Sequence, residues 1–222
     1  MFPSITRSLA IVGNGPSAAG QGQLIDACDD VLRINAWKTR GAPDSGTKIS
    51  IVLGFNTGVE EPPLDQYPGC EFWVQVWNPE TFSLKDPAHI FRIAHGRWIR
   101  AISKELSNAC DQWVRDTYEQ YGKDDVGTLP TAGYKAIVMA IREGSWSEIH
   151  LFGFDAVGST PQQMNDGYGR ENPYNQVPHA VLTQKRMFAA LADRGEWPDP
   201  LAPHIPRLVW HNRPEVPGYV AK

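Results

Sequence analysis

The chain has 222 residues and a hydrophobic content of 41%, which suffices for one full α/β domain, whereas two independent domains would each be small. Its formal net charge of -4 argues against a general nucleic-acid binder but leaves room for a local basic pocket that holds a single nucleotide. The three cysteines, Cys28, Cys70 and Cys110, are too scattered for a disulfide framework and lack the spacing of structural zinc ligands. We therefore expect a reducing, cytoplasmic environment.

The hydropathy pattern bears on targeting and membranes. The segment 1–7 lacks the charged start, apolar run and cleavage site of a signal peptide, and no apolar stretch approaches the roughly 20 residues that span a bilayer. We expect one domain over residues 1–222 with no transmembrane segment, and the sequence leaves the oligomeric state open.

The first half of the chain alternates strands with helices. We predict a strand over 8–13, a turn and helix over 17–28, a second strand over 30–35, and further strands near 49–53 and at 71–77. This βαβ order predicts an α/β fold with a mostly parallel sheet flanked by helices.

The second half begins with a long amphipathic helix within 91–122. Its apolar residues recur at spacings of three and four and predict a core-facing stripe of Ile99, Ile102, Leu106, Cys110 and Trp113. A helix over 131–142, capped by Thr131, then leads into a strand over 148–152. A final helix over 179–193 and a strand over 207–210 complete the domain.

Between the last two predicted helices lies a long segment, 156–178, that is rich in Gly, Pro, Gln and Asn and poor in aliphatic residues. Loops of this length in a compact domain commonly serve as lids. We interpret 156–178 as a lid over the acceptor or the phosphate.

The segment Ala10-Ile11-Val12-Gly13-Asn14-Gly15-Pro16-Ser17 is a short apolar strand that runs into a glycine turn. Such turns present backbone N–H groups to phosphate in α/β proteins. The second strand, Val31-Leu32-Arg33-Ile34-Asn35, carries two polar side chains where a buried parallel strand ordinarily has none. Together they indicate a nucleotide site.

A dinucleotide site is one interpretation of this turn, because Gly13, Gly15 and Ala18 fit G-x-G-x-x-A. The pattern alone is weak. A dinucleotide ribose calls for an acidic residue at the end of the second strand, where this chain has Arg33 and Asn35. An NAD- or FAD-dependent oxidoreductase therefore remains an alternative rather than the first choice.

Three blocks of sequence resemble the motifs of the sialyltransferases. The long motif of the family contains V-G-N, which matches Val12-Gly13-Asn14. It continues with I-D-x-x-D-x-V-x-R-x-N, which matches Ile25-Asp26-Ala27-Cys28-Asp29-Asp30-Val31-Leu32-Arg33-Ile34-Asn35. Leu129-Pro130-Thr131-Ala132-Gly133, followed by a helix and by Phe152-Gly153-Phe154, resembles the short motif. The aromatic-rich segment Tyr168–Asn175 with Pro178-His179 is similar to the last motifs.

The resemblance is to the animal-type enzymes of glycosyltransferase family 29, with a turn also similar to the bacterial family 42 enzymes. It implies a Rossmann-like, GT-A-variant fold and a metal-independent, inverting transferase. Such an enzyme moves sialic acid, or a related keto sugar such as Kdo, from a CMP-sugar donor to a glycan hydroxyl and needs no cofactor. The expected partners are the donor and a glycan acceptor, without nucleic acid.

The resemblance also assigns site residues. His179 would be the catalytic base, and Tyr168 and Tyr174 would act on the departing phosphate, as tyrosines do in the bacterial enzymes. The residues expected to bind the nucleotide or donor are Gly13, Asn14, Gly15, Pro16, Ser17, Asn35, Thr131, Ala132, Gly133, Gly153 and Asp155.

Several of these residues also have purely structural interpretations. Asn14 and Asn35 suit a turn and a strand end, and Thr131 suits a helix N-cap. A guanidinium between apolar neighbours needs an internal partner, so we expect Arg33 to pair with Asp26 or Asp29. His211 to Pro214 would add a cation near the pocket.

The chain departs from the family pattern at several positions. Gln184 stands five residues after His179, where animal-type enzymes have an acid, Gly167-Tyr168 replaces the start of their aromatic motif, and their paired cysteines are missing. The orienting role of an acid would then fall to Asp155 or Glu171. A catalytically impaired nucleotide-binding protein of the same fold, or a phosphotransfer enzyme, stays open as an alternative.

Overall fold

The computed structural model describes residues 7–34, 43–55, 69–75, 99–121, 130–154, 181–216 and 219. Within this part of the chain, seven strands form one sheet in the order β5-β4-β3-β2-β1-β6-β7, and every neighbouring pair is parallel. The strands are β1 (Ser8–Val12), β2 (Asp30–Ile34), β3 (Ile51–Phe55), β4 (Glu71–Gln75), β5 (Ile99–Ala101), β6 (Glu148–Phe152) and β7 (Arg207–Trp210).

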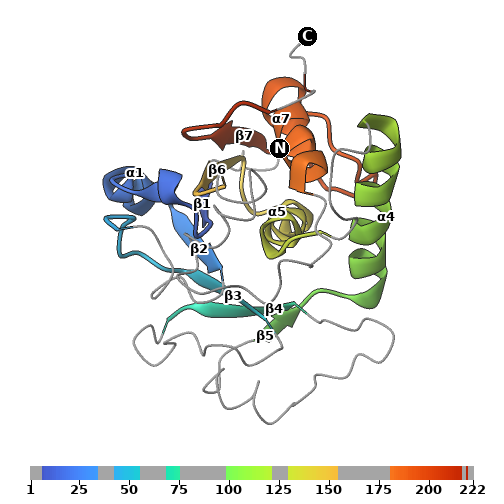
Figure 1. Cartoon of the computed structure of the whole chain (residues 1–222). Helices are drawn as coiled ribbons and strands as arrows, with labels where there is room; N and C mark the ends of the chain where they lie inside the picture. Colours follow the sequence, from blue (N-terminus) through green and yellow to red (C-terminus); the bar gives the residue numbers. More distant parts are fainter. Residues whose placement is uncertain are drawn as a thin grey trace, which may run out of the picture.

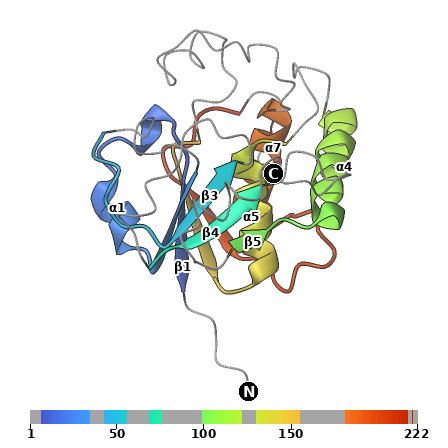
Figure 2. The ribbon, with the colours of Figure 1, turned by 90° about the horizontal axis from the view of Figure 1, so that it is seen from below.

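Helices lie on both faces of the sheet (Figures 1 and 2). The short α1 (Gly22–Ala27), preceded by the 3₁₀ turn η1 (Pro16–Ala18), covers one face. The opposite face carries α4 (Lys104–Tyr121), α5 (Ala132–Glu143) and α7 (Val181–Arg194). Because both faces are covered, the central strands are near-continuous apolar runs, as parallel sheets require.

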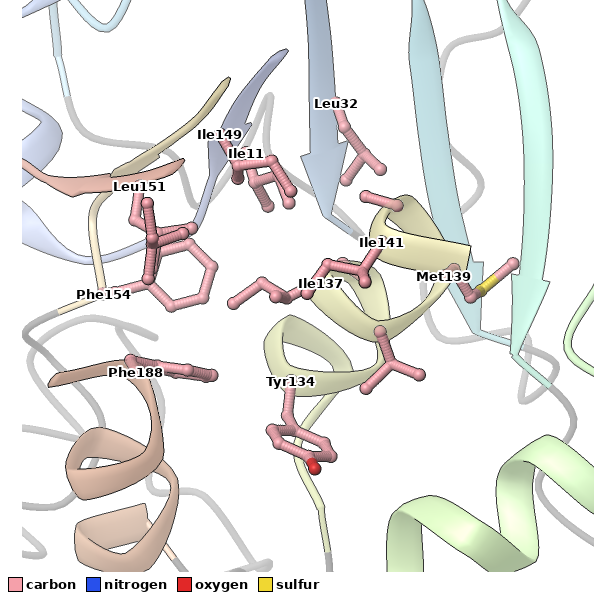
Figure 3. Close-up of a cluster of buried hydrophobic side chains, with 14 of the residues drawn as sticks. Ile11, Leu32, Tyr134, Ile137, Met139, Ile141, Ile149, Leu151, Phe154 and Phe188 are labelled. Atoms are coloured by element: carbon pink, nitrogen blue, oxygen red, sulfur yellow. The ribbon is translucent and has the colours of Figure 1, made fainter. Parts of the chain in front are cut away.

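The main core lies between the sheet and α5 (Figure 3). Ile11, Leu32 and Ile149 point from the strands toward Ile137 and Ile141 of the helix, and all five are buried. Thr131 caps α5 by accepting a hydrogen bond from the Tyr134 N–H, and Gly144 ends it at φ +67°. The helix start therefore lies at a fixed position against the sheet.

The strand order reverses between β1 and β6. From β1 the chain adds β2 to β5 on one side, then returns to place β6 and β7 on the other. In open α/β sheets, ligands bind outside the carboxyl ends of the strands at such a reversal. Val12 of β1 and Phe152 of β6 are register partners at that end of the sheet, so the residues that follow them flank the expected position.

Most of the predicted elements are confirmed, with three corrections. The predicted helix over 17–28 is a 3₁₀ turn followed by the shorter α1, and the strand predicted near 49–53 is β3, two residues later. Ile99 and Ile102 were both assigned to the amphipathic helix, but Ile99 belongs to the edge strand β5, Ile102 directly follows that strand, and α4 begins only at Lys104. The rest of the stripe packs in or against the core, as predicted.

Candidate functional site

Two glycines meet backbone to backbone at the carboxyl ends of β1 and β6. The Gly13 N–H donates to the Phe152 carbonyl at 2.8 Å, and the Gly15 N–H donates to the Gly153 carbonyl at 3.0 Å. A Cβ added to Gly13 would lie 2.5 Å from the Gly153 oxygen, and one added to Gly153 would lie 2.6 Å from the Gly13 oxygen. Neither position therefore accommodates a side chain.

This crossing changes the expected role of the glycine turn. Both glycine N–H groups are engaged by β6 and the residue after it, so they are not the phosphate donors that the sequence pattern suggests. Pro16 has no N–H, and with Ser17 it forms the 3₁₀ turn η1. The glycines allow close approach of two backbone segments at the strand-order reversal, which is a structural contribution to a site.

Asn14 lies between the two engaged glycines and turns its side chain toward the end of β2. Its Nδ2 donates to the Ile34 carbonyl at 3.3 Å. Its Oδ1 is buried without a hydrogen-bond partner among the described residues. A buried acceptor without a donor destabilises the folded state by about 1–3 kcal/mol. This oxygen is therefore a natural acceptor for a ligand hydroxyl or amino group.

The start of α5 lies at the same edge of the sheet. A Cβ on Gly133 would lie 2.7 Å from the ring of Phe154, which follows Gly153, so the α5 start packs directly against the end of β6. The N–H groups of Ala132 and Gly133 have no hydrogen-bond partner in the described part of the chain. These donors, together with the helix dipole, favour an anion at this end.

Gln184 in the first turn of α7 binds the start of α5. Its Oε1 accepts from the Thr131 N–H at 2.9 Å and from the Thr131 hydroxyl at 2.7 Å. The Thr131 hydroxyl in turn accepts from the Tyr134 N–H at 3.2 Å. The capping role foreseen for Thr131 is thus present, and its N–H and hydroxyl are both occupied by protein.

Asp26 and Asp29, the two aspartates that match the long motif, have structural roles. Asp26 accepts from the N–H groups of Thr47 and Lys48, and Asp29 accepts from the N–H and hydroxyl of Ser8. Burial pushes the pKa of Asp26 upward, but these backbone hydrogen bonds and the charge of Arg33 hold it below its ordinary value. Both carboxylates therefore anchor neighbouring segments.

Arg33 is 1% exposed and has the structural role expected of it. The guanidinium donates to the carbonyls of Lys48 at 3.0 Å and Ser45 at 2.9 Å. Asp26 is electrostatically coupled to it without being the partner of either bond. Arg33 thus fastens the segment before β3. Of the predicted pairing with Asp26 or Asp29, the structure shows an electrostatic attraction to Asp26.

A cluster of ionisable side chains that the sequence did not indicate lies on the α1 face of β6 and β7. His150 places Nε2 3.0 Å from Glu148 Oε2 and Nδ1 2.9 Å from His211 Nε2. The His211 ring stacks on Phe152 with centroids 4.2 Å apart. The alternation Glu148, His150, Phe152 along one strand face was the available signal.

The cation predicted in the segment after β7 would come from His211 or Arg213. Burial, and then the neighbouring His150, lower the pKa of His211 below its ordinary value, which favours the neutral ring. Arg213 donates to Asp193 at 2.8 Å. Asn212 does approach the glycine turn, donating to the Ser17 carbonyl at 3.1 Å.

Five predicted site residues lie outside the described part of the chain, namely Asn35, Asp155, Tyr168, Tyr174 and His179. The predicted lid over 156–178 and Glu171 lie outside it too. Their assignments stay predictions.

Two further features of the described residues concern metals and membranes. Among those residues, no group of three or more His, Cys, Asp or Glu side chains is arranged to hold a metal ion. None of the helices described is both long and apolar enough to cross a membrane.

No protein-family model matches the chain, and no curated protein matches it in sequence. The structure is similar to that of a mammalian sialyltransferase, with a TM-score of 0.56 and 19% identity over 84% of this chain and 66% of that one. A mammalian sialyltransferase in complex with Gal-beta-1-3GalNAc-ortho-nitrophenol gives a TM-score of 0.54 and 20% identity, with the same two coverages.

A weaker likeness is to the sialyltransferase CstII from Campylobacter jejuni in complex with the substrate analogue CMP-3FNeuAc, at a TM-score of 0.48 and 16% identity, over 93% of this chain and 80% of that one. The predicted sialyltransferase-like α/β fold is confirmed by the parallel sheet and the mammalian structures. The chain spans 66% of the length of those two structures.

Proposed function

We propose that the chain is a glycosyltransferase that moves sialic acid, or a related keto sugar such as Kdo, from a CMP-sugar to a glycan hydroxyl with inversion. The observation that carries the proposal is a coincidence of sequence and fold. The glycine turn of the long motif, at Gly13, meets Phe152-Gly153 of the short motif at the carboxyl ends of β1 and β6, where the strand order reverses.

The described residues suggest how the nucleotide is held. Asn14 offers a buried acceptor to which no described residue donates, and Ala132 and Gly133 offer N–H groups at the positive end of α5. A phosphate suits the helix start, and a ribose hydroxyl or a cytosine amino group suits the asparagine oxygen. Asn35, which follows β2, is the second proposed donor-binding amide.

The proposed chemistry needs one base and donors for the leaving group. His179 takes the proton of the acceptor hydroxyl as the acceptor oxygen attacks the anomeric carbon of the donor sugar. The new glycosidic C–O bond forms while the bond from that carbon to the CMP phosphate oxygen breaks. Tyr168 and Tyr174 donate hydrogen bonds to the departing CMP, and no metal is required in this scheme.

His179 is followed after one residue by Val181, where α7 begins. The positive end of a helix disfavours the charged imidazolium, which suits a histidine at a helix start to accept a proton near pH 7. This sequence position is the reason for assigning the base to His179.

Gln184 in place of the family acid supports one alternative, a nucleotide-binding protein of the same fold without transfer activity. A transferase turns over the CMP-sugar, whereas a non-catalytic nucleotide-binding protein only binds it. We expect the wild type to release CMP from CMP-sialic acid or CMP-Kdo in the presence of glycan acceptors and EDTA. His179→Ala is expected to lower that rate about 10²- to 10⁴-fold, the usual contribution of a general base.

His204→Ala is the matched control, because His204 bonds to the Trp146 carbonyl and lies near Gly144 at the other end of α5. It is expected to leave the rate unchanged. CMP binding without turnover by the wild type favours the non-catalytic alternative. Full activity of His179→Ala contradicts the assignment of the base.

A further inference from the structure

The contact between α5 and α7 converges on one oxygen atom. Oε1 of Gln184 accepts both the Thr131 N–H and the Thr131 hydroxyl, at 2.9 and 2.7 Å. Gln184 is only 2% exposed, so water does not replace these bonds readily. The Thr131 hydroxyl also caps α5 through the Tyr134 N–H, so one chain of hydrogen bonds links the first turns of both helices.

The helices joined in this way carry different parts of the proposed site. The start of α5 holds Ala132 and Gly133, which we assign to the nucleotide, and α7 begins two positions after the proposed base, His179. The distance between nucleotide and base therefore depends on the register between these two helix starts. An error of about 1 Å in such a distance can lower a rate about 100-fold.

The chemistry of the contact explains why it uses the side-chain oxygen of Gln184. Both groups that meet this oxygen are donors, so this contact requires an acceptor. A carboxylate oxygen would accept the same two bonds, and its charge would suit the positive end of α5. In this respect the amide is equivalent to the acid that animal-type relatives carry at the corresponding position.

We propose, on the basis of the function proposed above, that Gln184 is a positioning residue whose side-chain oxygen sets the start of α7 against the nucleotide-holding start of α5. Gln184, in place of the acid that animal-type relatives carry, then preserves catalysis rather than abolishing it. The inference concerns the oxygen and predicts that glutamate replaces glutamine while an apolar isostere does not.

The test compares Gln184→Glu, Gln184→Met and Leu191→Ala with the wild type. Leu191 is a buried residue farther along α7 and controls for loss of stability alone. For each variant, kcat and KM for the CMP-sugar and the pH profile of kcat are measured at a temperature at which thermal unfolding shows every variant folded.

We expect Gln184→Glu to keep kcat within about 3-fold and Gln184→Met to lose about 10- to 100-fold in kcat with a smaller change in KM. Leu191→Ala is expected to lower the unfolding temperature without lowering kcat. A Gln184→Met enzyme with normal kcat, or a Gln184→Glu enzyme as impaired as Gln184→Met, overturns the inference.

The inference and the proposed function fail in distinguishable ways. If the wild type turns over no CMP-sugar, the proposed function fails and the inference falls with it. If the wild type is active and the variants do not follow the expected order, the inference alone fails.

Discussion

At the scale of single residues, the crossing of Gly13 and Gly153 defines the centre of the candidate site. The glycine pattern located the turn correctly, but its usual interpretation assigned the backbone N–H groups to phosphate. The structure uses them between strands instead. Sequence alone does not reveal this, because the partner carbonyls belong to residues about 140 positions away.

Gly153 offers a direct test of this crossing. Its φ is +69°, and a Cβ there would meet the carbonyl oxygens of Gly13 at 2.6 Å and Gly15 at 3.1 Å. We expect Gly153→Ala to lower the free energy of unfolding by about 3 kcal/mol, measured by urea denaturation, because steric overlap adds to the cost of a positive φ.

Gly195 is the matched control, since its φ is +64° and nothing lies within 4 Å of an added Cβ. Gly195→Ala is expected to cost only about 1–2 kcal/mol, the conformational part alone. Equal losses for the two substitutions would contradict the close approach at Gly153.

Asn14 tests the proposed role of an unpartnered acceptor. We expect Asn14→Ala to weaken CMP binding about 10-fold, because one hydrogen bond to the nucleotide is lost, with a loss of stability below about 1 kcal/mol. Isothermal titration with CMP and urea denaturation measure the two quantities. Unchanged affinity for CMP would remove Asn14 from the donor site.

At the scale of elements, the predicted strands and helices were found wherever a periodic pattern was long. The exception, β5, is three residues long, and the spacing of Ile99 and Ile102 fits one helical turn as well as the end of a strand. Its strand character comes from pairing with β4, a contact that a local pattern does not encode. The contact between His150 and His211 was missed for the same reason, although the alternation along β6 was visible in the sequence.

The histidine cluster links the edge strand β7 to β6 and predicts a pH dependence of stability. His211 faces His150, which in turn contacts Glu148, and Glu148 also pairs with Arg207 of β7 at 3.0 Å. Burial and His150 lower the pKa of His211 from the ordinary 6.5. Between that value and the lower folded pKa, the unfolded chain binds more protons than the folded one.

The contribution of His211 to stability is therefore present above about pH 6.5 and is lost as the pH falls toward its lowered pKa. We expect His211→Gln to show a smaller decrease in the free energy of unfolding than the wild type between about pH 7 and pH 5. Urea denaturation across this range measures it. An identical pH dependence in the two proteins would contradict the lowered pKa.

An ion pair whose carboxylate is fully buried fastens the connection before β7 to the end of α5. Asp199 has a fully buried side chain, pairs with Arg142 through both carboxylate oxygens, and accepts the Leu201 N–H at 2.9 Å. Removal of one partner leaves the other charge poorly compensated. We expect Asp199→Ala to cost about 3 kcal/mol in thermal or urea unfolding.

Arg207→Ala serves as the comparison, because the Arg207 side chain is 77% exposed in its pair with Glu148. It is expected to cost less than about 1 kcal/mol. Similar losses for the exposed and the buried pair would show that the Asp199 contact contributes little.

At the scale of the whole molecule, the fold class followed from the alternation of strands and helices, and the family resemblance implied a Rossmann-like, GT-A-variant form of it. The strand-order reversal could not be derived from local patterns, because it depends on which strand β6 joins. That reversal brings the two motif regions, about 140 residues apart in sequence, to one edge of the sheet.

Selective recognition of CMP is the central claim. Its most direct test is a thermal-shift titration of the whole chain with CMP, AMP, UMP, NAD and FAD without added metal, since a ligand that binds the native state raises its unfolding temperature. We predict a concentration-dependent shift with CMP that exceeds the shifts with the other four ligands. No response to CMP together with a shift caused by NAD or FAD would contradict the proposed function and would indicate that the glycine turn belongs to a dinucleotide-binding site.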